Sequence, residues 1–305
     1  MGLNCDNTVM AWGRMRLAAP CIMVSSKDLY YLAPMTAFSK LRAAALALLG
    51  TAAAARGADT GTFIVAPLVG RVDVGAQYPS NGSQKLFKDS GTLYGVQAVY
   101  VSPQWVFTAL SHASDMRKGE ESGSLVTASR FFRTDSSWQP TAGFSLEHIL
   151  SHAALPPAEV WPLFSLDVRT DVWAFYPTAG VSYKAGGLRV TPYAGYFREA
   201  VGTMVTSDGM FVGPPPGRPG FQVKSSVDLD YASAGVKLEY QFGHVLRIDT
   251  KTYARFKKGE QTQYTTRNRL DIFLSRRLSL VLKYDRFLDK YESTTLLFAG
   301  PAFVF

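Results

Sequence analysis

Apolar and polar residues alternate with a period of two along most of the chain from about residue 62 onward. The clearest stretch runs from Leu246 to Lys257. One set of alternate positions there is Leu, Ile, Thr, Thr, Ala and Phe, and the other is Arg, Asp, Lys, Tyr, Arg and Lys. A helix of about 3.6 residues per turn would mix the two sets around its circumference, whereas a strand places them on opposite faces. The pattern therefore predicts β-strands.

Twelve segments fit this pattern, and all of them exceed the five or six residues that are usual for a strand of a globular protein. The predicted strands cover residues 62–76, 91–101, 104–114, 124–134, 139–150, 171–184, 188–200, 225–241, 244–257, 263–275, 278–288 and 294–305. Short and long links between the strands alternate along the chain. The short links are 102–103, 135–137, 185–187, 243 and 276–277; the others are the long links 77–90, 115–123, 151–170 and 201–224, followed by two shorter ones. The first five strands are less regular, so a count of ten is the alternative.

Two architectures can use such strands. A soluble sandwich buries the apolar face, whereas a membrane barrel turns that face to lipid and its polar face to the lumen. Spanning strands need about 9–11 residues, and short turns on one rim with long loops on the other are typical of outer-membrane barrels. An open sheet edge is costly in hydrocarbon, so the sheet must close. We therefore expect an all-β fold, an antiparallel transmembrane β-barrel of about twelve strands within residues 58–305.

The first 57 residues have the layout of an export signal. Lys40 and Arg42 precede a mostly apolar run from Ala43 to Ala55, and small residues follow. A basic start, a short apolar stretch and a small-residue cleavage site are typical of a secretory signal peptide. We expect a signal peptide at 35–57 with cleavage before Ala58, or alternatively at Ala54 or Ala55 because Arg56 interrupts the small residues, and a misassigned upstream extension at 1–34.

Composition narrows the remaining classes. The chain has 305 residues, is 47% hydrophobic and 18% charged, and carries a net charge of +8, a balance that excludes a disordered chain. Its longest nearly uninterrupted apolar run has 13 residues, too short for a helix that must cross about 30 Å of hydrocarbon. Removing 1–57 leaves a net charge of +4 and no cysteine. No compact basic patch remains, so we expect no nucleic-acid partner.

The C-terminal segment carries a family resemblance. Residues 296–305 read Leu-Leu-Phe-Ala-Gly-Pro-Ala-Phe-Val-Phe, and with the signal peptide and the alternating strands they resemble a Gram-negative outer-membrane β-barrel protein. The resemblance implies that Phe303 and Phe305 form a signal read by the barrel-assembly machinery. It also implies an outer-membrane location in contact with lipid and lipopolysaccharide. Pro301 departs from the pattern because it removes a ladder donor.

The polar faces of the strands between 244 and 288 are candidate lumen linings. Seven cations stand against three anions there: Arg247, Lys251, Arg255, Lys257, Arg267, Arg269 and Lys283 against Asp249, Asp271 and Asp285. A basic wall in a water-filled pore would favour anions. Alternatively, the charges satisfy one another as cross-strand pairs inside a narrow barrel. Aromatic residues at strand ends are expected to form interfacial girdles; they are Trp105, Trp173, Tyr240, Phe242, Tyr284, Phe287 and Phe305.

One pair of residues admits an enzymatic interpretation. His112 and Ser114 lie two positions apart and project from one face of a strand, a spacing that resembles the motif of small outer-membrane lipid A deacylases. A serine nucleophile needs a base within hydrogen-bond reach and an acid that orients it. The acids nearest in sequence, Asp115, Glu120 and Glu121, are expected in a loop, which makes them weak orienting acids. No HExxH, GxSxG, P-loop or dinucleotide fingerprint occurs, so we expect no cofactor and no metal site.

Three functions follow from these patterns. The leading one is not an enzyme but a narrow porin-like channel that transports small hydrophilic solutes, anions among them. The second is a plugged barrel that acts as a structural or surface-interaction protein through loops 151–170 and 201–224. The third is a lipid A or phospholipid hydrolase that uses His112 and Ser114.

Overall fold

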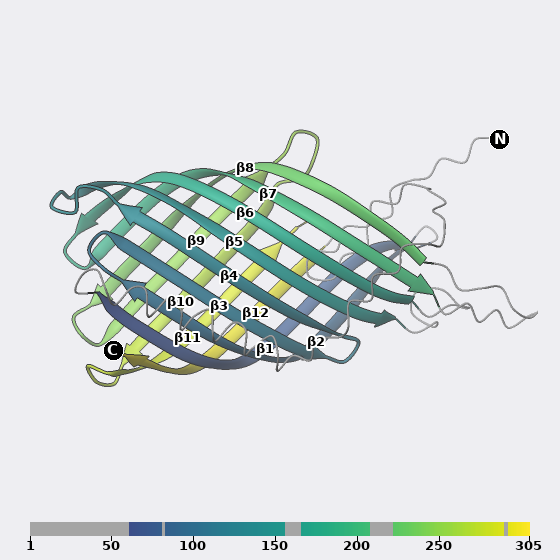
Figure 1. Cartoon of the computed structure of the whole chain (residues 1–305), viewed down its shortest axis with the longest axis horizontal. Helices are drawn as coiled ribbons and strands as arrows, with labels where there is room; N and C mark the ends of the chain where they lie inside the picture. Colours follow the sequence, from purple (N-terminus) through teal and green to yellow (C-terminus); the bar gives the residue numbers. More distant parts are fainter. Residues whose placement is uncertain (1–60, 81–82, 156–165, 208–221, 290–291) are drawn as a thin grey trace, which may run out of the picture.

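The chain forms a closed antiparallel barrel of twelve strands (Figure 1). The structure is a computed structural model that describes residues 61–80, 83–155, 166–207, 222–289 and 292–305. Its strands are β1 (Thr62–Ser80), β2 (Ser83–Val101), β3 (Trp105–Met116), β4 (Gly119–Phe131), β5 (Trp138–Leu155), β6 (Leu166–Ala185), β7 (Leu188–Ser207), β8 (Gln222–Phe242), β9 (Leu246–Phe256), β10 (Gln263–Phe273), β11 (Leu278–Leu288) and β12 (Glu292–Val304). The expected all-β fold and the count of twelve are confirmed, and the alternative of ten strands is wrong. The predicted signal peptide and upstream extension lie outside the described residues.

Each strand pairs with its sequence neighbours, and β12 returns to pair with β1. We call the junction of β1 and β12 the seam. Phe63 and Phe305 join its end, because the backbone N–H of each donates to the carbonyl of the other at 3.2 and 2.8 Å. Closure leaves no unpaired sheet edge in the wall. Among the described residues no helix is long and apolar enough to cross a bilayer.

The seam contains a local interruption. Its register pairs Val65 with Phe303 and resumes only at Val69 and Ala299. Pro67 and Pro301 lie within this gap on the two strands, and neither has a backbone N–H to donate. Pro301, which departs from the pattern of outer-membrane barrels, therefore lies where β1 and β12 are not paired.

The long links are shorter than the sequence indicated. The links expected at 77–90, 115–123, 151–170 and 201–224 are partly strand, because β1 to β8 continue beyond the predicted ends. The alternation fades near these ends as polar residues take the outward positions of the strands. Asp167 and Arg169 on β6, for example, precede the predicted start at 171 and form an ion pair at 3.2 Å. Backbone pairing continues regardless of side-chain polarity, so hydropathy alone underestimates strand length.

The outside of the barrel is apolar. All twelve strands carry at least one exposed large apolar side chain, such as Phe144, Trp173, Leu282 and Phe303. Soluble monomers rarely expose continuous apolar patches larger than a few hundred Å². A wall that is apolar on its outward face around the whole barrel fits a lipid surround.

Aromatic side chains gather at the ends of the outward face. Trp138 packs against Tyr183 near the short turns, with ring centroids 4.8 Å apart. Trp173 lies farther along β6 and stacks on His148 at 4.0 Å. Such pairs suit the two interfaces of a bilayer. The assignment of Phe287 to a girdle is wrong, because its ring receives the buried guanidinium of Arg255 at 5.0 Å.

Contacts between strands that are not neighbours identify the inward face. Ser233 on β8 donates a hydrogen bond to the hydroxyl of Tyr176 on β6 at 2.8 Å. Arg269 on β10 donates to Gln97 on β2 at 3.0 Å. Only side chains that point into the barrel can make such contacts, and the second one spans the interior.

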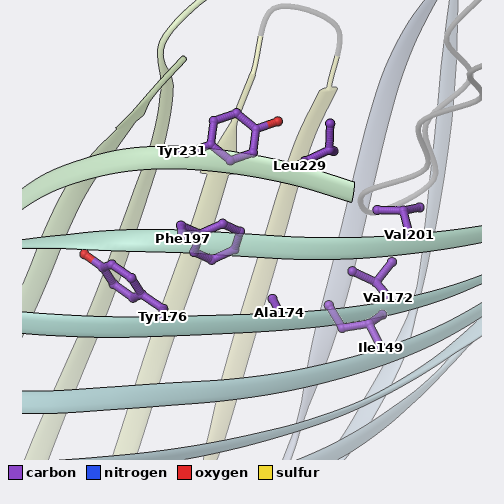
Figure 2. Close-up of a cluster of buried hydrophobic side chains, with 8 residues drawn as sticks. All are labelled: Ile149, Val172, Ala174, Tyr176, Phe197, Val201, Leu229 and Tyr231. Carbon is purple, nitrogen blue, oxygen red and sulfur yellow. The ribbon is translucent and has the colours of Figure 1, made fainter. Parts of the chain in front are cut away.

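Much of the interior is filled by two apolar clusters. The first, here called the β5–β8 cluster, is shown in Figure 2; it contains Ile149, Val172, Ala174, Tyr176, Phe197, Val201, Leu229 and Tyr231. The second, here called the seam cluster, contains Ala66, Leu68, Leu93, Leu110, Val281, Phe298 and Ala302. The inward face of this barrel is therefore polar over only part of its circumference.

Candidate functional site

A strip of charged side chains lies on the inward faces of four adjacent strands. We call it the charged strip; its members are Lys237, Glu239, Arg247, Asp249, Lys251, Arg267, Arg269, Asp271, Lys283 and Asp285 on β8 to β11. Strand pairing stacks these residues in rows across the wall. In one row three cations are consecutive, because Lys237 lies opposite Lys251 and Lys251 lies opposite Arg267; Asp285 follows on the far side of Arg267. Like charges directly opposite one another destabilise a sheet unless something offsets them.

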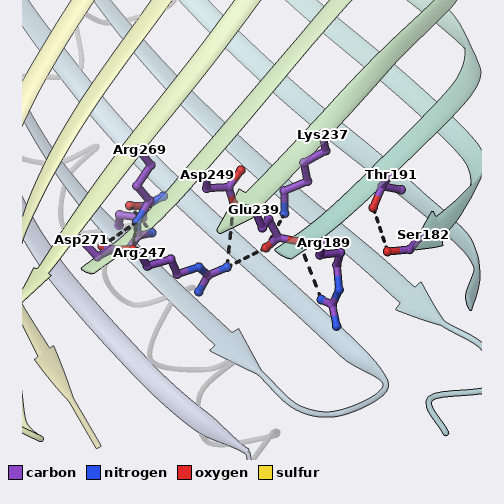
Figure 3. Close-up of polar contacts among 10 residues, drawn as sticks. Ser182, Arg189, Thr191, Lys237, Glu239, Arg247, Asp249, Arg269 and Asp271 are labelled. Carbon is purple, nitrogen blue, oxygen red and sulfur yellow. Dashed lines mark hydrogen bonds and ion pairs between the residues drawn. The ribbon is translucent and has the colours of Figure 1, made fainter. Parts of the chain in front are cut away.

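Glu239 offsets part of this charge. Its carboxylate lies 3.1 Å from the ammonium of Lys237, 2.8 Å from the guanidinium of Arg247 and 3.7 Å from that of Arg189 on β7 (Figure 3). Lys237 also contacts Asp249 at 3.2 Å. A buried carboxylate shared by three cations leaves each of them with a counter-charge.

The rest of the strip is paired as well, in part across the interior. Arg269 forms an ion pair with Asp271 at 2.8 Å, and Lys283 forms one with Asp285 at 2.8 Å. The guanidinium of Arg267 reaches Glu147 on the distant strand β5 at 3.6 Å. These pairs support the interpretation of the strip as a mutually satisfied network for most of its members.

Lys251 is the exception. Its ammonium lies over the rings of Tyr176, Tyr193 and Tyr253, at 5.4, 5.1 and 5.5 Å from their centroids. In the described part of the chain no carboxylate lies within ion-pair distance of it. The tyrosine faces attract the cation, yet they do not neutralise it.

A small pocket opens beside Lys251. It is lined by Leu125, Ser145, Glu147, Ala174, Tyr176, Phe197, Lys251, Tyr253 and Arg267. It lies between the charged strip and the β5–β8 cluster, so its wall combines cations, hydroxyl groups and apolar surface. The space has room for about one water molecule, so only a very small guest fits here.

The two remaining predicted lumen residues lie toward the end of β9 that is opposite the short turns. Arg255 is 1% exposed; its guanidinium is 3.9 Å from Glu199 and lies over Phe197 at 4.5 Å. Lys257 follows the end of β9 and pairs with Glu260 at 2.7 Å. Lys257 therefore belongs to the rim rather than to the charged strip.

His112 and Ser114 lie on the inward face of β3, and both are buried. Glu121 was expected in a loop, but it lies in β4 opposite Ser114, with a carboxylate oxygen 3.5 Å from His112 Nε2. Ser114 donates to the backbone carbonyl of Glu121 at 3.4 Å, and His112 Nδ1 has no hydrogen-bond partner among the described residues. The pair faces the interior, away from acyl chains, so this geometry gives a lipid hydrolase no support.

The predicted assembly residues point outward. Phe303 and Phe305 are 44% and 72% exposed, on the face of the closing strand that bears the apolar surface. No group of three or more His, Cys, Asp or Glu side chains in the described ranges is arranged to hold a metal ion.

Several members of this region were missed by the sequence analysis. Lys237, Glu239, Glu147, Tyr176 and Tyr193 surround Lys251 or its neighbours from strands β5 to β8. The alternation along each strand does assign these residues to the inward face, and this was the one sequence signal that could have identified them. Their convergence depends on the closure of the barrel, which the local pattern does not reveal.

No family model matches the sequence, and no curated protein matches it. Several solved structures are similar in fold. The translocator domain of the autotransporter NalP from Neisseria meningitidis is 10% identical, with a TM-score of 0.49, and the match covers 86% of this chain and 96% of that one. The β domain of the Bordetella autotransporter BrkA is 13% identical, with a TM-score of 0.42 and coverage of 80% and 99%.

The toluene transporter TodX from Pseudomonas putida is also similar, at 10% identity and a TM-score of 0.38, with coverage of 85% and 92%. At these identities and TM-scores the likeness carries no argument about function. The barrel itself rests on the strand pairing described above.

Proposed function

We propose that this chain is an outer-membrane barrel that forms a narrow channel for small hydrophilic solutes, with a preference for anions. The observation that carries the proposal is Lys251, an inward-facing cation without a carboxylate partner in a wall whose other charges are paired. An anion that enters the interior meets a positive group that the protein has not neutralised. A cation meets no equivalent unpaired carboxylate in the charged strip.

The membrane location is supported by the outer face. Large apolar side chains surround the wall, and aromatic pairs such as Trp138 and Tyr183 lie near its short-turn end. We propose that this face contacts outer-membrane lipid and lipopolysaccharide. We also propose that export depends on the segment 35–57, and that the assembly machinery reads Phe303 and Phe305 on the closing strand.

The narrowness follows from the contacts that cross the interior. Arg269 reaches Gln97, and Arg267 reaches Glu147, from strands that are not neighbours. Side chains that meet across the lumen leave room only for small solutes. Rings of charge at such a constriction decide the sign of the ions that pass.

The test is conductance in planar bilayers under a KCl gradient. The purified barrel should conduct in small steps, with a reversal potential on the anion-selective side. The variant Lys251→Gln should lose much of that selectivity. The matched control Lys257→Gln removes a cation that is paired with Glu260 at the rim and should leave the reversal potential unchanged.

Two results would contradict the proposal: a folded barrel without conductance, and firm cation selectivity. Folding can be verified independently with a gel, because membrane barrels stay folded in detergent until they are boiled. The variants should show the same shift on boiling as the unmodified protein.

A plugged structural barrel is the second candidate. The β5–β8 cluster and the seam cluster fill much of the interior, and this observation favours a lumen without a continuous path for solutes. Absence of conductance together with full folding would select this function over the channel.

A further inference from the structure

We propose that the pocket beside Lys251 is a binding site for one small monovalent anion, of which chloride is the simplest example. The site would hold the anion as a fixed counter-charge inside the barrel. The proposal deepens the channel function and rests on it for its physiological meaning, whereas binding itself can be measured without passage.

The first argument is charge. Lys251 lies in register between Lys237 and Arg267, so three cations adjoin one another on neighbouring strands. Lys237 has Glu239 and Asp249. Burying a charge without a partner is costly, and a bound anion would remove this cost for Lys251.

The second argument is the net charge of the pocket wall. Lys251, Arg267 and Glu147 are its charged residues, and Glu147 already lies 3.6 Å from Arg267. Two cations and one carboxylate leave a single positive charge. A monovalent anion neutralises it, whereas a divalent anion would overcompensate and approach Glu147 at an energetic cost.

The third argument is the supply of hydrogen-bond donors. The hydroxyl groups of Ser145, Tyr176 and Tyr253 belong to residues of the pocket wall. The Tyr176 oxygen accepts a hydrogen bond from Ser233, which leaves the tyrosine's own proton for another partner. Hydroxyl protons and an ammonium group together suit an acceptor-only guest.

The fourth argument is size and rigidity. The pocket admits a species about as large as one water molecule, which fits a monatomic anion better than an organic acid. Tyr176, Tyr193 and Tyr253 hold the ammonium of Lys251 by their ring faces. The cation is therefore positioned before the anion arrives.

The experiment measures the NMR line width of chloride in the presence of the full-length barrel, purified in a zwitterionic detergent. Chloride that exchanges with a protein site gives an excess line width that saturates as chloride is added at constant ionic strength with gluconate. The unmodified barrel should show this saturable component. Lys251→Met should lose it, and Lys251→Arg should retain it.

The control is Lys257→Met, which removes a cation outside the pocket and should keep the saturable component. All variants should first show the shift on boiling that marks a folded barrel. If Lys251→Met fails to fold, Lys251→Gln takes its place, since its polar side chain tolerates the same surroundings.

The results separate this site from the channel. A folded, unmodified barrel without saturable broadening overturns the anion site, even if anion-selective currents are observed. Equal broadening in Lys251→Met and in the unmodified protein overturns it too. Saturable binding that depends on Lys251, in a barrel that passes no current, supports the site while defeating the proposed channel.

Discussion

The arc formed by β8 to β11 and the arc formed by β12 with β1 to β3 use their inward faces differently. In the first arc the inward positions carry the charged strip and the outward ones carry residues such as Leu282. In the second arc the inward positions carry the seam cluster, for example Leu93 and Phe298, both fully buried. The first arc follows the usual rule of a polar lumen. The second resembles the core of a small filled barrel.

This comparison suggests that the two arcs have different roles. The seam cluster provides packing where the first and last strands meet and where the ladder is interrupted between Val65 and Val69. The charged strip provides the chemistry, because it holds the one inward cation of the strip that lacks a carboxylate partner among the described residues. Stability should therefore depend most on the first region and selectivity on the second.

The largest effect is expected from Phe298→Ala. Phe298 is fully buried in the seam cluster, against His112 and Lys283, so truncation leaves a cavity worth about 4 kcal/mol of stability. Urea unfolding of the barrel in liposomes measures the loss. The control Phe144→Ala removes an outward ring whose space lipid can fill, and it should cost much less. Equal losses of unfolding free energy in the two variants would contradict the contrast between a buried interior ring and a lipid-facing one.

Glu239→Gln should come next. The carboxylate pairs with Lys237, Arg247 and Arg189. Its removal takes the carboxylate from Arg189 and leaves Lys237 and Arg247 to share Asp249, at a cost of about 3 kcal/mol. The same urea experiment measures this cost. Asp73→Asn is the control, because Asp73 forms an exposed ion pair with Arg71, which contributes little to stability. A loss at Glu239 no larger than at Asp73 would show that the strip is hydrated rather than buried.

Leu282→Arg tests which face of β11 meets lipid. Leu282 is an outward residue near the middle of β11, where a charge in the bilayer costs about 2 kcal/mol or more. The variant should unfold from liposomes at lower urea concentration. In detergent micelles, where the charge reaches water easily, the penalty should shrink. An unchanged midpoint in liposomes would place this position away from the hydrocarbon.

Lys251→Met should have the smallest effect on stability. It removes a buried cation that has no carboxylate partner, and its side chain is of similar length, so stability should change by less than about 1 kcal/mol. Selectivity should nevertheless fall. A large destabilisation without a change in reversal potential would assign Lys251 to packing instead of function.

The sequence was sufficient for the strands but not for the site. Period-two alternation located all twelve strands and the short turns, because outward residues such as Leu280 and Leu282 must be apolar wherever lipid is the neighbour. The same rule failed at the strand ends, where residues such as Asp167 and Arg169 on β6 are polar although the ladder continues.

The contacts between side chains on distant strands could not be predicted from the local sequence pattern. Arg267 was expected on a polar face, but its pairing with Glu147 depends on how strands β5 and β10 come together in the closed wall. Glu121 was placed in a loop and lies instead beside His112 in a strand. The lack of a carboxylate partner for Lys251 likewise follows from closure rather than from spacing.

The most direct test of the account is a scan of single spin labels along β11, from Leu278 to Tyr284, in the reconstituted barrel. Labels at 278, 280, 282 and 284 should be accessible to oxygen dissolved in the lipid, and labels at 279, 281 and 283 should be shielded from it. A flat profile, or an alternation of the opposite phase, would contradict the claim that alternate side chains of this wall face hydrocarbon.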